Sequence, residues 1–192
     1  MKSFFRDYSY SSVKMFVNQF AISMFGSVLA MATVAMGNNA VTICISIFAI
    51  LFYLFLIYNM TWEIGARDKI SADAGKKKYS PLTGLYMSLL ANSLSFIIAI
   101  VYTVGYPFMT SHVWAGNMCT VMRVLSIFTN GMYLGLMSAI DIGGKALNQY
   151  WFTYFLVTVP ALVTAGASYY IGTKDFKFTS LFAEKKDTTT KK

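Results

Sequence analysis

Four long apolar stretches without formal charge are the feature that most constrains the fold of this chain. Each is long enough to cross about 30 Å of hydrocarbon as a helix, which takes roughly 20 predominantly apolar residues. The stretches are residues 15–36, 40–60, 82–106 and 150–172. The sequence therefore predicts an all-α, polytopic membrane helical bundle in which these four stretches are full crossings.

The placement of the basic residues predicts the orientation of the bundle. Of the 16 Lys and Arg residues, 14 lie in residues 1–14, 61–81 and 173–192, whereas the connections at 37–39 and 107–120 contain none. Lys and Arg near the ends of membrane helices are retained on the cytoplasmic side. We therefore expect both termini and the polar loop 62–80 to be cytoplasmic.

A fifth apolar stretch, residues 119–140, conflicts with a simple fifth crossing, because five crossings would place the basic C-terminal segment outside. Polar, charged and small residues also interrupt it or end it: Arg123, Asn130, Gly131, Gly135 and Asp141. A charge at the membrane centre is costly, although Arg123 is close enough to one end of the stretch to reach the interface. We predict an outer re-entrant or surface helix here, with five true crossings as the alternative.

The chain is too short and too continuously apolar for a separate soluble domain. It is expected to form one transmembrane domain over residues 1–186, followed by a disordered polar tail at 187–192. The pI near 9.4 indicates contact with the anionic headgroups of the lipid bilayer rather than with nucleic acid. Candidate residues for headgroup or partner docking are Arg67, Asp68, Lys76, Lys77, Lys78, Lys174 and Asp175.

A short pattern recurs after two of the apolar stretches. Residues 64–68 read Ile-Gly-Ala-Arg-Asp and residues 171–175 read Ile-Gly-Thr-Lys-Asp, while residues 142–145 repeat part of it. Glycine followed by a cation suits the C-terminus of a helix, so helix capping is the expected role, with partner docking as the alternative. Glu63 and Arg67 are spaced to form a solvated ion pair.

Mildly polar and small residues within the apolar stretches recur at helical spacing. Two stretches carry one stripe each: Gln19, Ser23 and Ser27, and Ser88, Asn92 and Ser95. The stretch 119–140 carries two, a polar stripe with Arg123, Ser126 and Asn130 and a stripe of small residues with Gly131 and Gly135. Such stripes are typical of close helix packing with hydrogen bonds across the contact, and they also suit a polar cavity for a small solute. Both interpretations stay open at this point.

The sequence offers little for catalysis. His112 is the single histidine, and the two cysteines, Cys44 and Cys119, do not form a metal cluster with it at any recognised spacing. The two cysteines are expected either to pair near the outer face or to remain thiols. Phosphate-binding glycine loops and nucleophile elbows are absent from the sequence. We therefore expect neither an enzyme nor a cofactor.

Three segments of the chain, Trp62–Lys69, Met132–Leu136 and Tyr169–Lys177, resemble segments of small multi-pass membrane proteins from low-GC Gram-positive bacteria. The resemblance implies a bacterial cytoplasmic membrane. It carries no catalytic or binding residue across to this chain.

Two functions are compatible with these features. The first is a non-enzymatic membrane subunit that associates with another membrane component, such as a transporter or export assembly, or with further copies of itself. The second is a small-solute binding or transport protein of the membrane. The lack of catalytic motifs favours the first.

Overall fold

The structure, a computed structural model, describes residues 2–76 and 80–174 of the chain. Most of these residues are helical, so the predicted all-α class is confirmed, and the strands among them are two, of two residues each, that form a hairpin. The expectations for Lys77, Lys78 and Asp175, and for the tail 187–192, lie outside the described residues.

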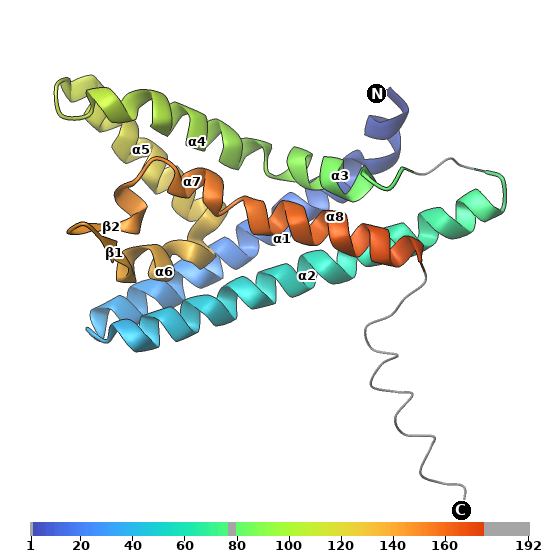
Figure 1. The fold of residues 1–192 in the computed structure, drawn as a ribbon, viewed down its shortest axis with the longest axis horizontal. Helices are drawn as coiled ribbons and strands as arrows, with labels where there is room; N and C mark the ends of the chain where they lie inside the picture. The colour runs from blue at the N-terminus through green and yellow to red at the C-terminus, as the bar shows by residue number, and fades with distance from the viewer. Residues whose placement is uncertain (1, 77–79, 175–192) are drawn as a thin grey trace, which may run out of the picture.

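The first two helices, α1 (Lys2–Ala35) and α2 (Asn39–Asp73), form a long antiparallel pair (Figure 1). Gly37 adopts a φ of 68° in the turn between them. Asn38 caps α2, because its side-chain oxygen accepts a hydrogen bond from the Ala40 amide at 3.1 Å. At 34 and 35 residues, these helices are about 50 Å long, so they extend well beyond the hydrocarbon core of a bilayer.

The expected polar loop 62–80 is wrong over its first part, because α2 continues without a break to Asp73. Two ion pairs, each between residues four apart in α2, stabilise this extension. Glu63 and Arg67 approach to 2.8 Å, which confirms the predicted pair, and Lys69 and Asp73 approach to 2.6 Å. The polar residues 62–73 therefore form the last turns of α2.

The stretch expected as one crossing at 82–106 is divided at Asn92. It forms α3 (Thr83–Ala91) and α4 (Ser93–Gly105), which meet at an angle of 59°. A short 3-10 helix, η1 (Tyr106–Phe108), follows α4.

The stretch at 119–140 belongs to two helices that reverse direction. α5 (Val113–Asn130) begins within the connection expected at 107–120 and ends at η2 (Gly131–Tyr133), after which α6 (Leu134–Ala139) leads away. Figure 1 shows α5 running from one end of the bundle towards its middle and α6 returning to that same end. We call α5, η2 and α6 together the re-entrant hairpin, because the chain returns to the end of the bundle from which it entered (Figure 1).

The chain returns through strands β1 (Asp141–Ile142) and β2 (Lys145–Ala146), η3 (Leu147–Gln149), α7 (Thr153–Leu156) and α8 (Val159–Thr173). The helix cap expected at 142–145 is wrong. Gly143 and Gly144 have φ values of 58° and 78° and connect the two antiparallel strands. Two successive positive φ angles are what a two-residue β-hairpin turn requires.

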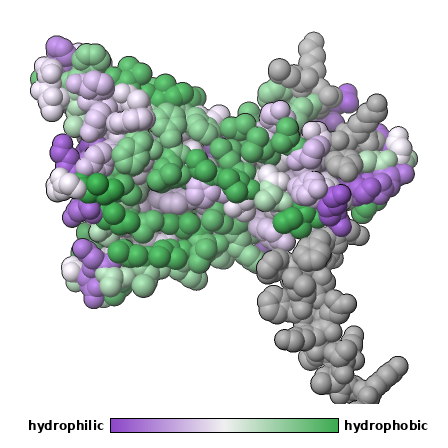
Figure 2. All heavy atoms as spheres, in the orientation of Figure 1, coloured by the Kyte–Doolittle hydropathy of each residue, from purple (hydrophilic) through white to green (hydrophobic). Residues whose placement is uncertain are grey.

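The bundle has two ends of different character. The start of α1, the end of α2 and the end of α8 lie at one end, whereas β1, β2 and the start of α5 lie at the opposite end (Figure 1). Figure 2 shows apolar side chains over the middle of the molecule and hydrophilic ones towards both ends.

The membrane-length helices can be counted within the described residues. Three helices are long and apolar enough to cross a membrane: Phe4–Ala35, Asn39–Asp73 and Thr153–Thr173, the last of which joins α7 and α8. There are four if the bent pair α3 and α4 forms one span, and α5 is not among them. These helices support a helical membrane protein.

Candidate functional site

A polar cluster ties the re-entrant hairpin to two other helices near the middle of the bundle. The side-chain amide of Gln19 in α1 donates to Asn92 Oδ1 at 3.0 Å, to Ser95 Oγ at 3.4 Å and to the backbone carbonyl of Thr129 at 2.9 Å. Thr129 lies in the last turn of α5, where carbonyl groups lose their helical partners. Gln19 therefore satisfies a backbone acceptor that the reversal of the chain leaves free.

Asn92 lies at the bend between α3 and α4. Its side-chain amide donates to the carbonyl oxygen of Ser88 at 3.0 Å. The same carbonyl oxygen also accepts a hydrogen bond from the backbone amide of Asn92 at 2.9 Å, so the side chain adds a second hydrogen bond to it at the bend. The polar residue at 92 is thus a structural part of the broken helix.

Small residues let the re-entrant hairpin approach the first two helices closely. A methyl group at Gly131 would overlap the carbonyl oxygen of Ser23, and one at Gly135 would overlap the hydroxyl of Ser46. A methyl group at Gly26 would lie 2.5 Å from the Cα atom of Met132. Close backbone contact at small residues is a common way for membrane helices to pack.

The structure thus brings together residues from the three stretches in which the stripes were expected. All nine residues are buried: Gln19, Ser23, Ser27, Ser88, Asn92, Ser95, Asn130, Gly131 and Gly135. Most of them serve the packing of α1 against α3, α4 and the re-entrant hairpin. Asn130 differs, because it also lines a cavity.

That cavity lies between the two arms of the re-entrant hairpin and the connection that leads into α7. It has a volume of about 230 Å³, and we call it the Arg123 cavity. Its lining is Arg123, Ser126, Ile127 and Asn130 from α5, Leu134 and Met137 from α6, Asn148 from η3, and Tyr154 from α7. An arginine, a serine and two asparagines therefore line the space together with apolar residues.

Two tyrosines hold the guanidinium of Arg123 in place. The Nε and Nη2 atoms of Arg123 donate to the hydroxyl oxygen of Tyr102 at 3.2 and 2.9 Å. The ring of Tyr102 packs on that of Tyr154 with their centres 4.4 Å apart, and Tyr154 donates to the Asn148 carbonyl at 2.9 Å. The guanidinium is therefore directed against the bundle rather than outward to the surface.

The sequence placed Arg123 in an apolar stretch but gave no partner for it. Its partner Tyr102 lies 21 residues away on a different helix. A charge within an apolar stretch was the available signal, since ionisable residues in such segments usually mark functional sites.

The residues expected to dock headgroups or a partner divide into two groups. Arg67, Lys76 and Lys174 are exposed at the end of the bundle where α2 and α8 end. Asp68 is only 6 % exposed, so it is not the accessible docking residue expected from the sequence. Its Oδ2 atom accepts hydrogen bonds from the hydroxyls of Tyr8 at 2.5 Å and Tyr169 at 2.8 Å, so Asp68 links α1, α2 and α8.

The repeated glycine pattern has a packing role rather than the expected capping role at Gly65, which lies inside α2. A methyl group at Gly65 would overlap the carbonyl oxygen of Tyr169 in α8. A methyl group at Gly172 would in turn overlap the carbonyl oxygen of Trp62 in α2. The two similar segments therefore pack directly against each other.

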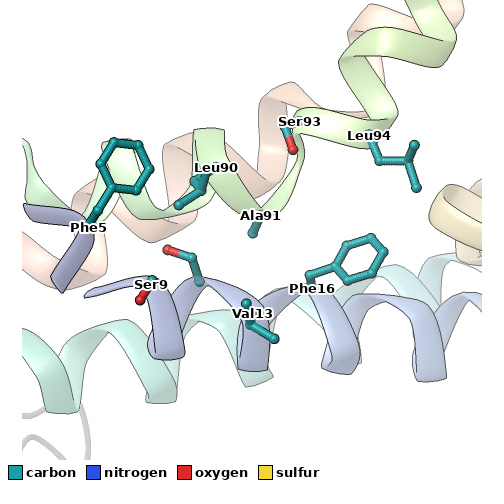
Figure 3. A pocket seen from close by; sticks show the side chains of 9 residues that line it. Phe5, Ser9, Val13, Phe16, Leu90, Ala91, Ser93 and Leu94 are labelled. Carbon is teal, nitrogen blue, oxygen red and sulfur yellow. The ribbon is translucent and has the colours of Figure 1, made fainter. Parts of the chain in front are cut away.

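A groove of about 390 Å³ lies between the N-terminal half of α1 and the α3–α4 bend. Figure 3 shows side chains from both sides facing it, namely Phe5, Ser9, Val13 and Phe16 from α1, and Leu90, Ala91, Ser93 and Leu94 around the bend. Ser12 also lines the groove, and its buried hydroxyl has no hydrogen-bond partner among the described residues.

The cysteines and histidine form no metal site in the described part of the chain, where no group of three or more His, Cys, Asp or Glu side chains is placed to hold an ion. Cys44 is an exposed thiol and Cys119 a buried one, so the disulfide alternative is wrong. Comparisons with protein-family models, curated proteins and solved structures gave no match. No functional residue is therefore carried over from a relative.

Proposed function

We propose that this chain is a non-enzymatic protein of the bacterial cytoplasmic membrane that binds a small solute in the Arg123 cavity. The observation that carries the proposal is a cavity lined by a cation, a hydroxyl and two amides at the turn of a re-entrant hairpin. Non-helical backbone at membrane depth is tolerated where it is buried in protein or lines a cavity, and such sites commonly hold ligands.

In the proposed topology, α1, α2, the bent pair α3–α4, and α7–α8 cross the membrane four times, with both ends of the chain in the cytoplasm. The concentration of basic residues in 1–14, 61–81 and 173–192 supports this orientation. The Arg123 cavity, which reaches Asn148 near the β-hairpin end, then lies towards the outer face.

Single-cysteine labelling of whole cells tests the topology, in a background with Cys44→Ala and Cys119→Ala. A membrane-impermeant thiol reagent should modify Gly144→Cys in intact cells, and should reach Lys76→Cys and Thr188→Cys only after lysis. External labelling of position 188 together with an internal position 76 would instead establish an odd number of crossings.

Accessibility of the cavity tests the binding function. In the same background, a small methanethiosulfonate reagent should modify Ser126→Cys in the purified protein. Ser27→Cys is the matched control, because Ser27 is equally buried but does not line the Arg123 cavity. Equal, negligible reactivity at both positions would show that solutes do not enter, and would overturn the proposal.

Association with another membrane protein is the second candidate, and the groove beside Ser12 is the observation that favours it. A transmembrane helix of a partner seated there would cover exposed Phe5 and Val13 and could supply an acceptor for the Ser12 hydroxyl. A photo-crosslinker at Val13 should then form a discrete adduct in membranes, whereas one at exposed Val163 should not. Adducts with lipid alone at both positions would contradict this candidate.

A further inference from the structure

We propose that the Arg123 cavity takes a small organic carboxylate, bound through the guanidinium of Arg123. This inference rests on the proposed solute-binding function and adds the chemical class of the solute. It follows from the charge balance of the cavity, the hydrogen-bond donors that remain free there, and the division of its wall into a polar and an apolar part.

The charge balance favours a negative partner. Arg123 is partly buried, and no carboxylate lies within 4 Å of it in the part of the chain that the structure describes. A cation inside an apolar bundle is costly unless an opposite charge or water compensates it. The hydroxyl and ring of Tyr102, 5.7 Å from the guanidinium carbon to the ring centre, provide only partial compensation.

Enough donors remain to hold an anion. A guanidinium group has five N–H donors, of which two are used on Tyr102, so three are left for further acceptors. The hydroxyl of Ser126 is buried and has no hydrogen-bond partner within the described ranges. Asn130 and Asn148 also line the cavity, and the side-chain amide of Asn130 donates to Thr129 Oγ1 at 3.1 Å. A planar guanidinium matches the two oxygens of a carboxylate.

The apolar part of the wall favours a carboxylate with a short hydrocarbon body over an inorganic oxyanion. Ile127, Leu134 and Met137 line the cavity beside the polar group. An inorganic oxyanion would leave these side chains facing polar oxygens, whereas a short alkyl chain would bury apolar surface against them. The volume of about 230 Å³ is below the usual range for drug-sized ligands, so the solute is small.

Thermal unfolding of the full chain in detergent, at constant ionic strength, tests the assignment with defined probes. Sodium acetate, propionate and butyrate should raise the melting temperature in a saturable way. The matched neutral amides, acetamide, propionamide and butyramide, should not. Inorganic phosphate, and anionic phospholipid mixed into the detergent micelles, are included to separate the other sources of an anionic group.

Variants then assign the effect to the cavity. Arg123→Gln should weaken carboxylate binding by about tenfold or more, because it removes a charge-assisted hydrogen bond. Arg123→Lys should weaken it less, since it keeps the charge but loses the fork geometry. Arg67→Gln, which changes an exposed arginine far along the chain in α2, should leave it unchanged. If Arg123→Gln does not fold, Ser126→Ala provides the second test, with weaker binding expected.

Several results would overturn the inference. One is an equal rise in melting temperature with carboxylates and with neutral amides. A second is a rise with carboxylates that is undiminished in Arg123→Gln or in Ser126→Ala. A third is a rise with phosphate or anionic lipid but not with carboxylates. If Ser126→Cys is modified but carboxylates have no effect, the solute-binding function stands and the carboxylate assignment fails. If Ser126→Cys is unreactive, the binding function itself fails.

Discussion

Two charged side chains are held by tyrosine hydroxyls at different ends of the bundle, and their surroundings differ. Asp68 is 6 % exposed and receives hydrogen bonds from Tyr8 and Tyr169 on two other helices. Arg123 is less buried, donates to the single hydroxyl of Tyr102, and lines a cavity. The first arrangement fastens three helices together, whereas the second leaves donors free. Burial alone therefore does not distinguish a charge that joins helices from one whose donors remain available.

The largest expected effect comes from removing the Asp68 carboxylate. Asp68→Leu should lower the free energy of unfolding in detergent by about 2–4 kcal/mol, because the hydroxyls of Tyr8 and Tyr169 then lose their acceptor inside the bundle. Arg123→Met, which keeps a long apolar side chain and removes a poorly compensated charge, should change it by less than about 1 kcal/mol. Equilibrium denaturation measures both. A larger loss of unfolding free energy for Arg123→Met than for Asp68→Leu would contradict the comparison.

A smaller loss is expected where α2 and α8 touch near Asp68. Gly65→Ala should destabilise the bundle by about 1–3 kcal/mol, because its methyl group overlaps the Tyr169 carbonyl oxygen and the backbones must separate. Gly166→Ala in α8 is the control: its methyl group would lie 3.7 Å from the nearest Leu85 atom, and alanine favours helix by up to about 1 kcal/mol. Equal melting temperatures for the two variants would show that this contact is not close.

The central polar cluster should respond more weakly. Asn92→Leu removes the hydrogen bonds to Gln19 and to the Ser88 carbonyl, so a loss of roughly 0.6–2 kcal/mol is expected. Ile97→Leu, on an exposed face of α4, should have no effect. The cluster joins the α3–α4 bend to the re-entrant hairpin through Gln19. Asn92→Leu should therefore also reduce the rise in melting temperature that carboxylates cause. An unchanged melting temperature would mean that the bend does not depend on this side chain.

The smallest effect is expected for the exposed ion pair one turn from Asp68. Glu63 and Arg67 approach to 2.8 Å, but their side chains are 66 % and 72 % exposed. Glu63→Gln should therefore cost less than about 0.5 kcal/mol, and this cost should vanish at high salt. A loss as large as that of Asp68→Leu would show that charge on this face of α2, rather than burial of the carboxylate, stabilises the end of the bundle.

The sequence by itself determined the features that depend on local composition. Uncharged apolar runs predicted helices of membrane length, and residues four apart predicted the ion pair between Glu63 and Arg67. Both follow from properties that neighbouring residues carry with them, namely hydropathy and helical spacing. The polar stripes also named the residues that the bundle buries, such as Gln19, Asn92 and Gly131.

Only the tertiary structure decided what those residues do, because their partners are distant in sequence. Asp68 looked like an exposed charge until Tyr169, 101 residues away, was found to bond it. Gly65 fitted a helix cap by its neighbours alone, but the backbone of α8 requires it as a small residue within α2. Arg123 gained its role from Tyr102 and from the reversal of the chain at η2, which encloses the cavity. Local patterns fix which segments are helical and apolar, whereas non-local packing fixes which polar groups are satisfied and which remain free to bind.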